Sequence, residues 1–167
     1  AGANANAALP EGETVLMLAS HTGNAEAVKL LLDRGADANT QQVRGQTALM
    51  WAAAEGHADA VKLLLARGAD PALSSAASTK QEKRPPGGMT ALLFASRQGR
   101  LDAVRALLDG GAGVDQAGAD HTSPLLIAGV HGHYDVTSPL IESGANIHTR
   151  SPKMDPGYIA EWICSPS

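Results

Sequence analysis

Apolar residues form short stripes with the spacing of one face of an α-helix. Within residues 45–70 the stripes are Leu49, Ala52 and Ala53, and then Val61, Leu64 and Leu65. The i, i+3, i+4 spacing predicts two short helices. Thr47 is a good N-cap for the first helix, because its hydroxyl can accept a hydrogen bond from a free backbone N–H. Gly56 and Gly68 can close the two helices in the left-handed conformation.

The same pattern occurs four times. A Thr-x-Leu or Ser-Pro-Leu triplet opens each copy, and a glycine that begins a Gly-Ala-Asp or similar triplet closes it. The triplets start at Thr14, Thr47, Thr90 and Ser123, and the glycines are Gly35, Gly68, Gly111 and Gly144. Both markers advance by 33, 43 and 33 residues. A single helix pair cannot bury its own apolar stripes, so the 33-residue period predicts a stacked array, an architecture whose usual role is binding.

These repeats resemble the ankyrin repeat, whose unit contains Gly-x-Thr-Pro-Leu-His-x-Ala-Ala-x-x-Gly-His, Val-x-x-Leu-Leu and Gly-Ala-Asp-x-Asn. The matches in the first unit are Leu16, Ala19, Gly23, Val28, Leu31, Leu32, Gly35, Ala36, Asp37 and Asn39. Those in the third are Leu92, Ala95, Gly99, Val104, Leu107, Leu108, Gly111 and Ala112. The resemblance covers residues 9–150. It implies an all-α solenoid of stacked helix-turn-helix units joined by hairpin-like loops.

The resemblance divides the chain into four units and their flanking segments. Residues 1–8 resemble the tail of a preceding repeat, because the Gly2–Asn6 stretch lies 33 residues before Gly35–Asn39, so we expect the array to continue upstream. The remaining divisions are units at 9–41 and 42–71, an inserted loop at 72–88, units at 89–117 and 118–150, and a degenerate cap or partial repeat at 151–167.

The chain departs from the family pattern in three ways. The family's His after Thr-Pro-Leu is replaced by an apolar residue in every unit, so apolar packing must take over its role. Pro139 falls within the second helix of the fourth unit, where proline costs about 3 kcal/mol, and this predicts a late start, a kink or a frayed helix. Third, the end of the chain fits the repeat poorly. Residues 155–163 could instead form one capping helix, with Asp155 as N-cap and Pro156 at the first helical position. The residues that replace the family's His are Met17, Met50, Leu93 and Leu126.

Ten residues beyond the period fall within residues 72–88. This segment has no apolar period and carries Lys80, Lys83 and Arg84 against a single Glu82. The sequence therefore predicts a mobile loop here, which is either a solvated linker or a finger that contacts a partner. Its cations would favour an acidic surface.

Composition excludes several classes of protein. Net charge is −4 with the two signs interspersed, and aromatic residues make up 3% of the chain, so neither a basic field nor a stacking platform for nucleic acid is expected. The longest apolar run, at 48–54, is too short to span a membrane. One cysteine excludes an internal disulfide framework. For a soluble chain with one cysteine and no visible signal peptide, the default expectation is the cytoplasm.

Three groups of residues suggest chemistry, and we interpret each as structural. His131 and His133, with Asp135 and His121 near them in sequence, could bind a metal. However, His57 and His133 both follow the glycine between two helices, where the family commonly carries a structural His. Cys164 has no catalytic motif around it. Met17, Met50, Trp51, Phe94 and Met89 could line a ligand pocket, but all except Met89 fall at first-helix positions that we assign to the core between units.

We therefore expect no catalytic, cofactor or metal site and no enzymatic activity. The resemblance implies a module that binds another protein through its concave face and linking turns. The alternatives are a structural or intramolecular docking segment of a longer multidomain protein and, more weakly supported, a binder of a metal or small molecule. Self-association is a further expectation, because the first unit should expose apolar residues around Leu18 and Leu30. The candidate partner-binding residues are Glu11, Glu13, His21, Thr22, Val43, Arg44, Gln46, Ala54, Glu55, Lys80, Lys83, Arg84, Met89, Arg97, Gln98, Asp120, Thr122, Val130 and His131.

Overall fold

The computed structural model describes residues 4–76 and 87–148 of the 167-residue chain. Within these residues the secondary structure is helical, with isolated β-bridges at Ala8 with Thr14 and at Ser74 with Thr90. The helices are α1 (Val15–His21), α2 (Ala25–Asp33), α3 (Ala48–Glu55), α4 (Ala58–Ala66), α5 (Ala91–Arg97), α6 (Leu101–Asp109), α7 (Pro124–Val130) and α8 (Tyr134–Glu142). The predicted all-α array of helix pairs is confirmed.

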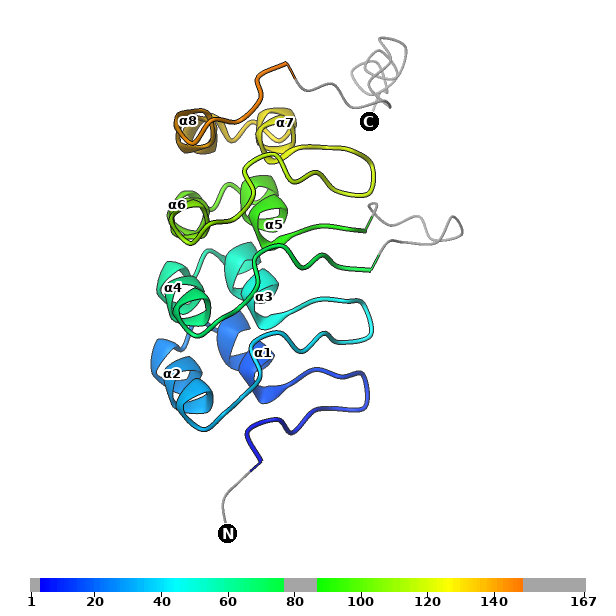
Figure 1. Cartoon of the computed structure of the whole chain (residues 1–167), viewed down its shortest axis with the longest axis vertical. Coiled ribbons are helices and arrows are strands. Elements are labelled where there is room, and N and C mark those ends of the chain that lie inside the picture. Colours follow the sequence, from blue (N-terminus) through cyan, green and yellow to red (C-terminus); the bar gives the residue numbers. More distant parts are fainter. Residues whose placement is uncertain (1–3, 77–86, 149–167) are drawn as a thin grey trace, which may run out of the picture.

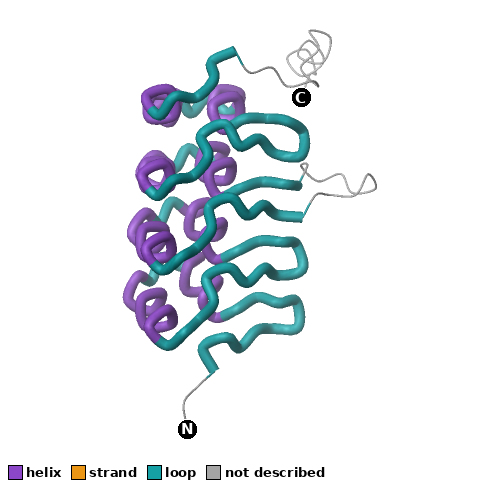
Figure 2. The backbone as a smooth tube through the Cα atoms, in the orientation of Figure 1, coloured by secondary structure: helices purple, strands orange, loops and turns teal. Residues whose placement is uncertain are grey.

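The helix pairs stack into two parallel layers (Figure 1). The first helices α1, α3, α5 and α7 pack on one another in order, and the second helices α2, α4, α6 and α8 form the outer layer. Loops that link successive units extend from the far side of the first-helix layer (Figure 2). We call these loops fingers, and their described residues are 4–14, 37–47, 70–76 with 87–90, and 113–123.

The first helices begin where the repeated triplets predict. The hydroxyl oxygens of Thr14, Thr47, Thr90 and Ser123 each accept a hydrogen bond from the N–H three residues later, at 3.2 to 3.4 Å. Each such cap contributes about 1 kcal/mol. Gly56 has a φ of 83° and closes α3 in the left-handed conformation, as predicted.

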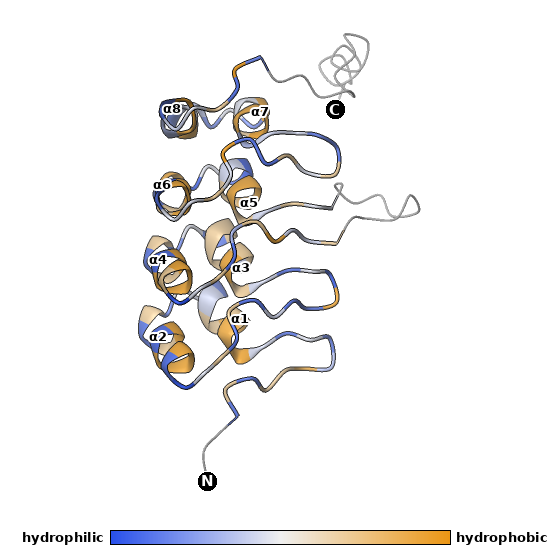
Figure 3. Cartoon of the chain, in the orientation of Figure 1, coloured by the Kyte–Doolittle hydropathy of each residue, from blue (hydrophilic) through white to orange (hydrophobic). Residues whose placement is uncertain are grey.

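The apolar stripes belong to one core cluster that extends over all four units. Figure 3 shows apolar residues on the helices of both layers. Leu49, Ala52 and Ala53 are fully buried, as are Val61 and Leu64, whereas Leu65 is half-buried. The apolar residues that replace the family's His are also buried in the first three units, at Met17, Met50 and Leu93. Leu126 in the last unit is half-buried. Apolar packing therefore takes the place of that histidine.

Asparagine side chains form hydrogen bonds between successive units. Asn39 accepts from the N–H of Asp70 and donates to the carbonyl of Gly68. Asn6 makes the same two contacts with Asp37 and Gly35, at 2.8 and 3.1 Å. Asn6 thus occupies the position that Asn39 has at the end of a unit. The assignment of residues 1–8 to the tail of a repeat stays a prediction.

An ion pair also joins the first two units. The Asp33 carboxylate lies 2.8 Å from Lys29 Nζ on the same helix and 2.6 Å from an Arg67 guanidinium nitrogen in the second unit. Hydrogen bonds from Lys29 and then from Arg67 hold the pKa of Asp33 below its usual value of 3.8. The pair is exposed to solvent, so its contribution to stability is small.

Backbone hydrogen bonds link neighbouring fingers. The N–H groups of Val43, Ala76 and Ala119 donate to the carbonyls of Glu11, Arg44 and Gly87 respectively, at 2.7 to 3.3 Å. One glycine per finger lies against the next finger: a Cβ on Gly12, Gly45 or Gly88 would approach Gln42, Ala76 or Ala119 within 3.2 Å. The fingers therefore form a bonded edge along the array.

The described ends of the predicted loop 72–88 belong to this edge. Ser75 donates its N–H to Met89 and accepts from Gly88, at 3.0 and 2.9 Å. Residues 77–86 lie outside the described part of the chain. They include Lys80, Lys83 and Arg84, so the proposed role of these cations stays a prediction. The predicted capping helix at 155–163 and Cys164 also lie outside the described residues.

The prediction of a late start for the second helix of the last unit is wrong. α8 begins at Tyr134, the position equivalent to the first residue of the other second helices, and includes Pro139. Val136, Pro139 and Leu140 are buried against α6 and α7. Their packing offsets the N–H that proline lacks, because most helix stability in proteins comes from burial of the apolar face.

Replacing Pro139 with alanine should stabilise the protein by about 1–2 kcal/mol, since it restores an N–H inside α8 and removes the clash of the proline ring. Alanine already occupies the equivalent position in α6, at Ala106. Thermal unfolding followed by circular dichroism would measure the change. Pro124→Ala is the control, because Pro124 occupies the first helical position, where proline is well tolerated. An equal gain in both variants would contradict the proposed strain.

The first unit exposes an apolar end, as predicted. Leu18 and Leu30 are 40% and 55% exposed, and Leu9 and Val15 of the same unit are also exposed. In the second and third units the residues equivalent to Val15 are Ala48 and Ala91, and both are buried. Self-association through this end stays a prediction.

Candidate binding surface

Four large apolar side chains occupy the same position in the four first helices, four residues after the N-cap. They are Leu18, Trp51, Phe94 and Ile127, and we call them the apolar row. Leu18 is exposed and the other three are half-buried, whereas the alanine that follows each of them is buried. Because the first helices pack side by side, the four residues repeat at the spacing of neighbouring helices, about 8–10 Å.

The apolar row corrects the assignment of Trp51 and Phe94 to the core between units. Met17 and Met50, one residue earlier in their helices, are fully buried, as predicted. Trp51 and Phe94 pack against the core with one side and keep part of their surface in solvent. Residue type alone does not separate these positions, since both carry large apolar residues.

Polar residues lie beside the apolar row near the ends of the first helices. The imidazole of His21 meets the Trp51 ring edge-on, with ring centroids 5.3 Å apart, and its Nδ1 lies 3.8 Å from a Glu55 carboxylate oxygen. The other Glu55 oxygen lies 4.0 Å from Arg100. The predicted contact residues here are exposed at His21, Thr22, Glu55, Gln98, Val130 and His131, and half-buried at Ala54 and Arg97.

The fingers carry the remaining predicted contact residues. Glu11, Val43 and Arg44 are exposed, and Val43 is 70% exposed. The half-buried ones are Glu13, Gln46, Asp120 and Thr122. The Gln46 amide oxygen accepts from Gln42 at 2.9 Å, and the Asp120 carboxylate accepts from the N–H of Thr122 at 3.1 Å. These bonds restrain the finger surfaces.

Met89 does not belong to this surface. Its side chain is 7% exposed, and its N–H donates to the Ser75 hydroxyl at 3.1 Å. The residue before the N-cap Thr90 therefore faces the inside of its finger. We withdraw Met89 from the candidate contact residues.

The two histidines that follow an inter-helix glycine, His57 and His133, bond to the preceding unit; of these, His133 also belonged to the group that suggested a metal site. Nε2 of His57 lies 3.0 Å from the carbonyl oxygen of His21, and Nε2 of His133 lies 3.1 Å from that of Arg97. A ring protonated at Nε2 donates to that carbonyl. Arg100 occupies the equivalent position in the third unit and donates through Nε to Ala54 at 3.1 Å. His133 is thus structural, as predicted.

Glycine makes room for these cross-unit side chains. A Cβ on Gly23 or Gly99 would lie 2.4 Å from the His57 or His133 ring, and one on Gly56 would lie 2.8 Å from Arg100. The His131 ring stacks on His133 with centroids 6.4 Å apart. Within residues 4–76 and 87–148, no group of three or more His, Cys, Asp or Glu side chains could hold a metal ion.

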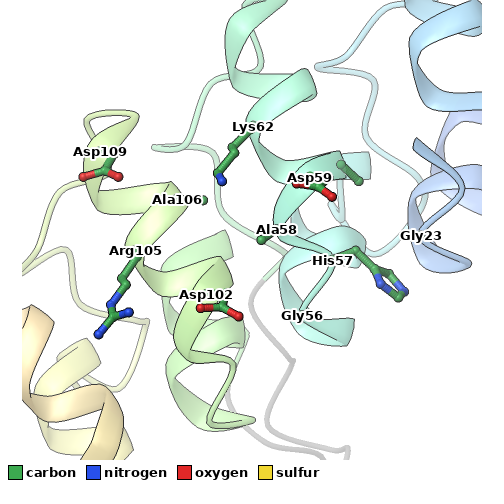
Figure 4. Close-up of a pocket in the computed structure, with 11 residues that line it drawn as sticks. Gly23, Gly56, His57, Ala58, Asp59, Lys62, Asp102, Arg105, Ala106 and Asp109 are labelled. Carbon is green, nitrogen blue, oxygen red and sulfur yellow. The ribbon is translucent and has the colours of Figure 1, made fainter. Parts of the chain in front are cut away.

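A shallow groove of about 580 Å³ lies on the outer layer between α4 and α6 (Figure 4). Asp59 and Lys62 from α4 and Asp102, Arg105 and Asp109 from α6 line it. Figure 4 shows Asp59 and Asp109 on opposite sides of the groove. Among the described residues, those that line the groove include no Ser, Thr or Cys.

Comparison with known proteins places the repeats in a described family. A family model for ankyrin repeats, in three copies, matches residues 1–75 and again residues 72–151. A search of curated proteins found no match. Among the described residues, the structure contains no helix with the length and apolar character that a membrane crossing requires.

Proposed function

Since the chain belongs to the ankyrin repeat family, we propose that it binds another protein through the apolar row and the polar residues beside it. Ankyrin repeats are generally protein-interaction modules without enzymatic activity. The partner inserts apolar side chains between the fingers and the first helices, and no chemical step follows.

The apolar row is the observation that carries this proposal. A tryptophan and a phenylalanine on adjacent helices α3 and α5 keep part of their surface in solvent. Aromatic side chains of this kind dominate binding energy at protein interfaces. Leu18 and Ile127 extend the row to the first and last units. A partner that matches the row needs apolar side chains about 8–10 Å apart on one side, which is roughly every third residue of a polyproline II segment.

Charges along the row would select among apolar partners. Glu11 and Glu13 lie in the first finger, Arg44 lies in the second, and Arg97 lies on α5. The acidic end and the more basic middle would favour a partner with the opposite order of charges. The fingers are hydrogen-bonded to one another, so little conformational entropy is lost when a partner binds.

A combined Trp51→Ala and Phe94→Ala change should weaken binding at least about tenfold, which corresponds to about 1.4 kcal/mol, because it removes the two aromatic contacts. The probe would be a peptide selected from a displayed library against the folded 167-residue chain. Isothermal titration calorimetry would measure the dissociation constant. Far-UV circular dichroism would verify that the variant keeps its helices.

Lys62→Ala is the matched control, because Lys62 is an exposed residue of the outer groove and lies outside the apolar row. Its affinity for the peptide should equal that of the unchanged chain. Loss of binding in the Lys62 variant, with full binding in the aromatic variant, would place the site in the outer groove and overturn the proposal.

A further inference from the structure

The last unit has an apolar end face that the earlier units do not expose. We define the end face as Leu125, Leu126, Gly129, Ile141 and Ile147. Ile141 and Ile147 are 50% and 63% exposed, whereas the equivalent residues of the first unit, Leu32 and Ala38, are buried. Leu125, Leu126 and Gly129 on α7 are half-buried. An apolar surface of this kind is normally covered.

The earlier units show what covers the α7 part of this face. The residues equivalent to Leu125 and Leu126 are Leu16 and Met17 in the first unit, and both are fully buried. The residue equivalent to Gly129 is Ser20, which is fully buried as well. In each case the first helix of the following unit packs on the preceding first helix, as α3 packs on α1. The missing cover thus has the position of one further first helix.

The chain contains a segment with the sequence of such a helix. Asp155-Pro156 repeats the Ser123-Pro124 pair that starts α7, and Ile159 and Ala160 follow at the same distances as Ile127 and Ala128. Tyr158 and Trp162 are four residues apart in the sequence, so a helix formed here would place both on one side. Gly157 and Glu161 depart from the pattern, since the four units carry leucine at the first position and a small residue at the second.

The length of the connection also fits. Six residues lie between His148 and Asp155, and seven lie between the equivalent pair, Asp115 and Ser123. The segment can therefore reach the position of the next first helix by the same route as α7.

We propose that residues 155–163 of the same chain cover the end face and occupy the position of a fifth first helix over α7. The contact closes the stack at its last unit. It also removes from solvent an apolar surface that would otherwise be open to other proteins.

Gly129→Gln tests this contact. A Cβ on Gly129 meets no atom of the described residues within 4 Å, and glutamine favours helix more than glycine does, so α7 should tolerate the change. The added side chain would occupy the space that the segment needs. Hydrogen exchange of the 167-residue chain, followed by mass spectrometry, should show amides 157–163 exchanging at least about tenfold faster in the variant. Val130→Gln is the control, because Val130 is the next residue of α7 and is already exposed.

A second measurement does not depend on Gly129. In a Trp51→Phe chain Trp162 is the only tryptophan, and iodide should quench its fluorescence less in the folded chain than in urea. Equal quenching in both conditions would overturn the proposal. So would exchange at 157–163 that Gly129→Gln leaves unchanged. Protection that appears only as the protein dimerises in sedimentation equilibrium would also overturn it, because the cover would then be a second copy.

Discussion

Replacing Leu64 with alanine is expected to lower the free energy of unfolding by about 3 kcal/mol. Leu64 is fully buried, and its helix α4 packs on α2, α3 and α6, so it contributes to the contacts between three units. The smaller side chain would leave a cavity that these short, closely packed helices cannot fill. Urea denaturation followed by circular dichroism at 222 nm, the usual helix signal, would measure the loss.

Leu30→Ala is the control for this experiment. It removes the same atoms from the neighbouring helix α2, but Leu30 is 55% exposed. The expected loss is within about 0.5 kcal/mol, as for most surface substitutions. Equal losses in the two variants would mean that Leu30 is covered in solution, which would contradict its exposure in the first unit.

Gly45→Ala should destabilise the array by about 3 kcal/mol, for two separate reasons. Gly45 has a φ of 69°, in the left-handed region that alanine disfavours. In addition, the new Cβ would lie 2.5 Å from the backbone nitrogen of Ala76. Backbone atoms cannot move aside as a flexible side chain can, so the second and third fingers would separate and the hydrogen bond from Ala76 to Arg44 would be lost.

Gly35→Ala separates the cost of the left-handed backbone conformation from the cost of the close contact between fingers. Gly35 also has a positive φ, at 81°, but a Cβ there meets nothing within 4 Å. Its expected cost is about 1 kcal/mol, from backbone conformation alone. The difference between the denaturation midpoints of the two variants measures the close approach of the fingers. Equal costs would mean that the fingers are free to move apart.

The repeat pattern predicts the helices, the caps and the core because each depends on local sequence. Thr47 caps its helix through a contact three residues away. Leu49 lies on the apolar stripe of its helix and is buried, as the stripe predicts. α8 shows the limit of local reasoning. Pro139 weakens the helix by itself, yet the burial of Val136 and Leu140 maintains it.

The candidate surface was predicted less well. Met50 and Trp51 are both large side chains at adjacent positions of one helix. Only the packing of neighbouring helices shows that Met50 faces the core while Trp51 faces solvent in part. Arg100 could have been found from sequence, since it stands ten residues after the cap Thr90, as His57 does after Thr47. The approach of Gly45 to Ala76 could not, because it depends on how two fingers pair.

Each first helix packs mainly on its immediate neighbours, and the two ends of the described array lie far apart along its long axis (Figure 1). Under tension applied to those ends, the helix pairs are therefore expected to unfold one after another. A 33-residue unit that unfolds releases at most about 110 Å of extended chain. The pair that contains Pro139 is the expected first step, so a pulled molecule would lengthen in discrete increments starting from that end.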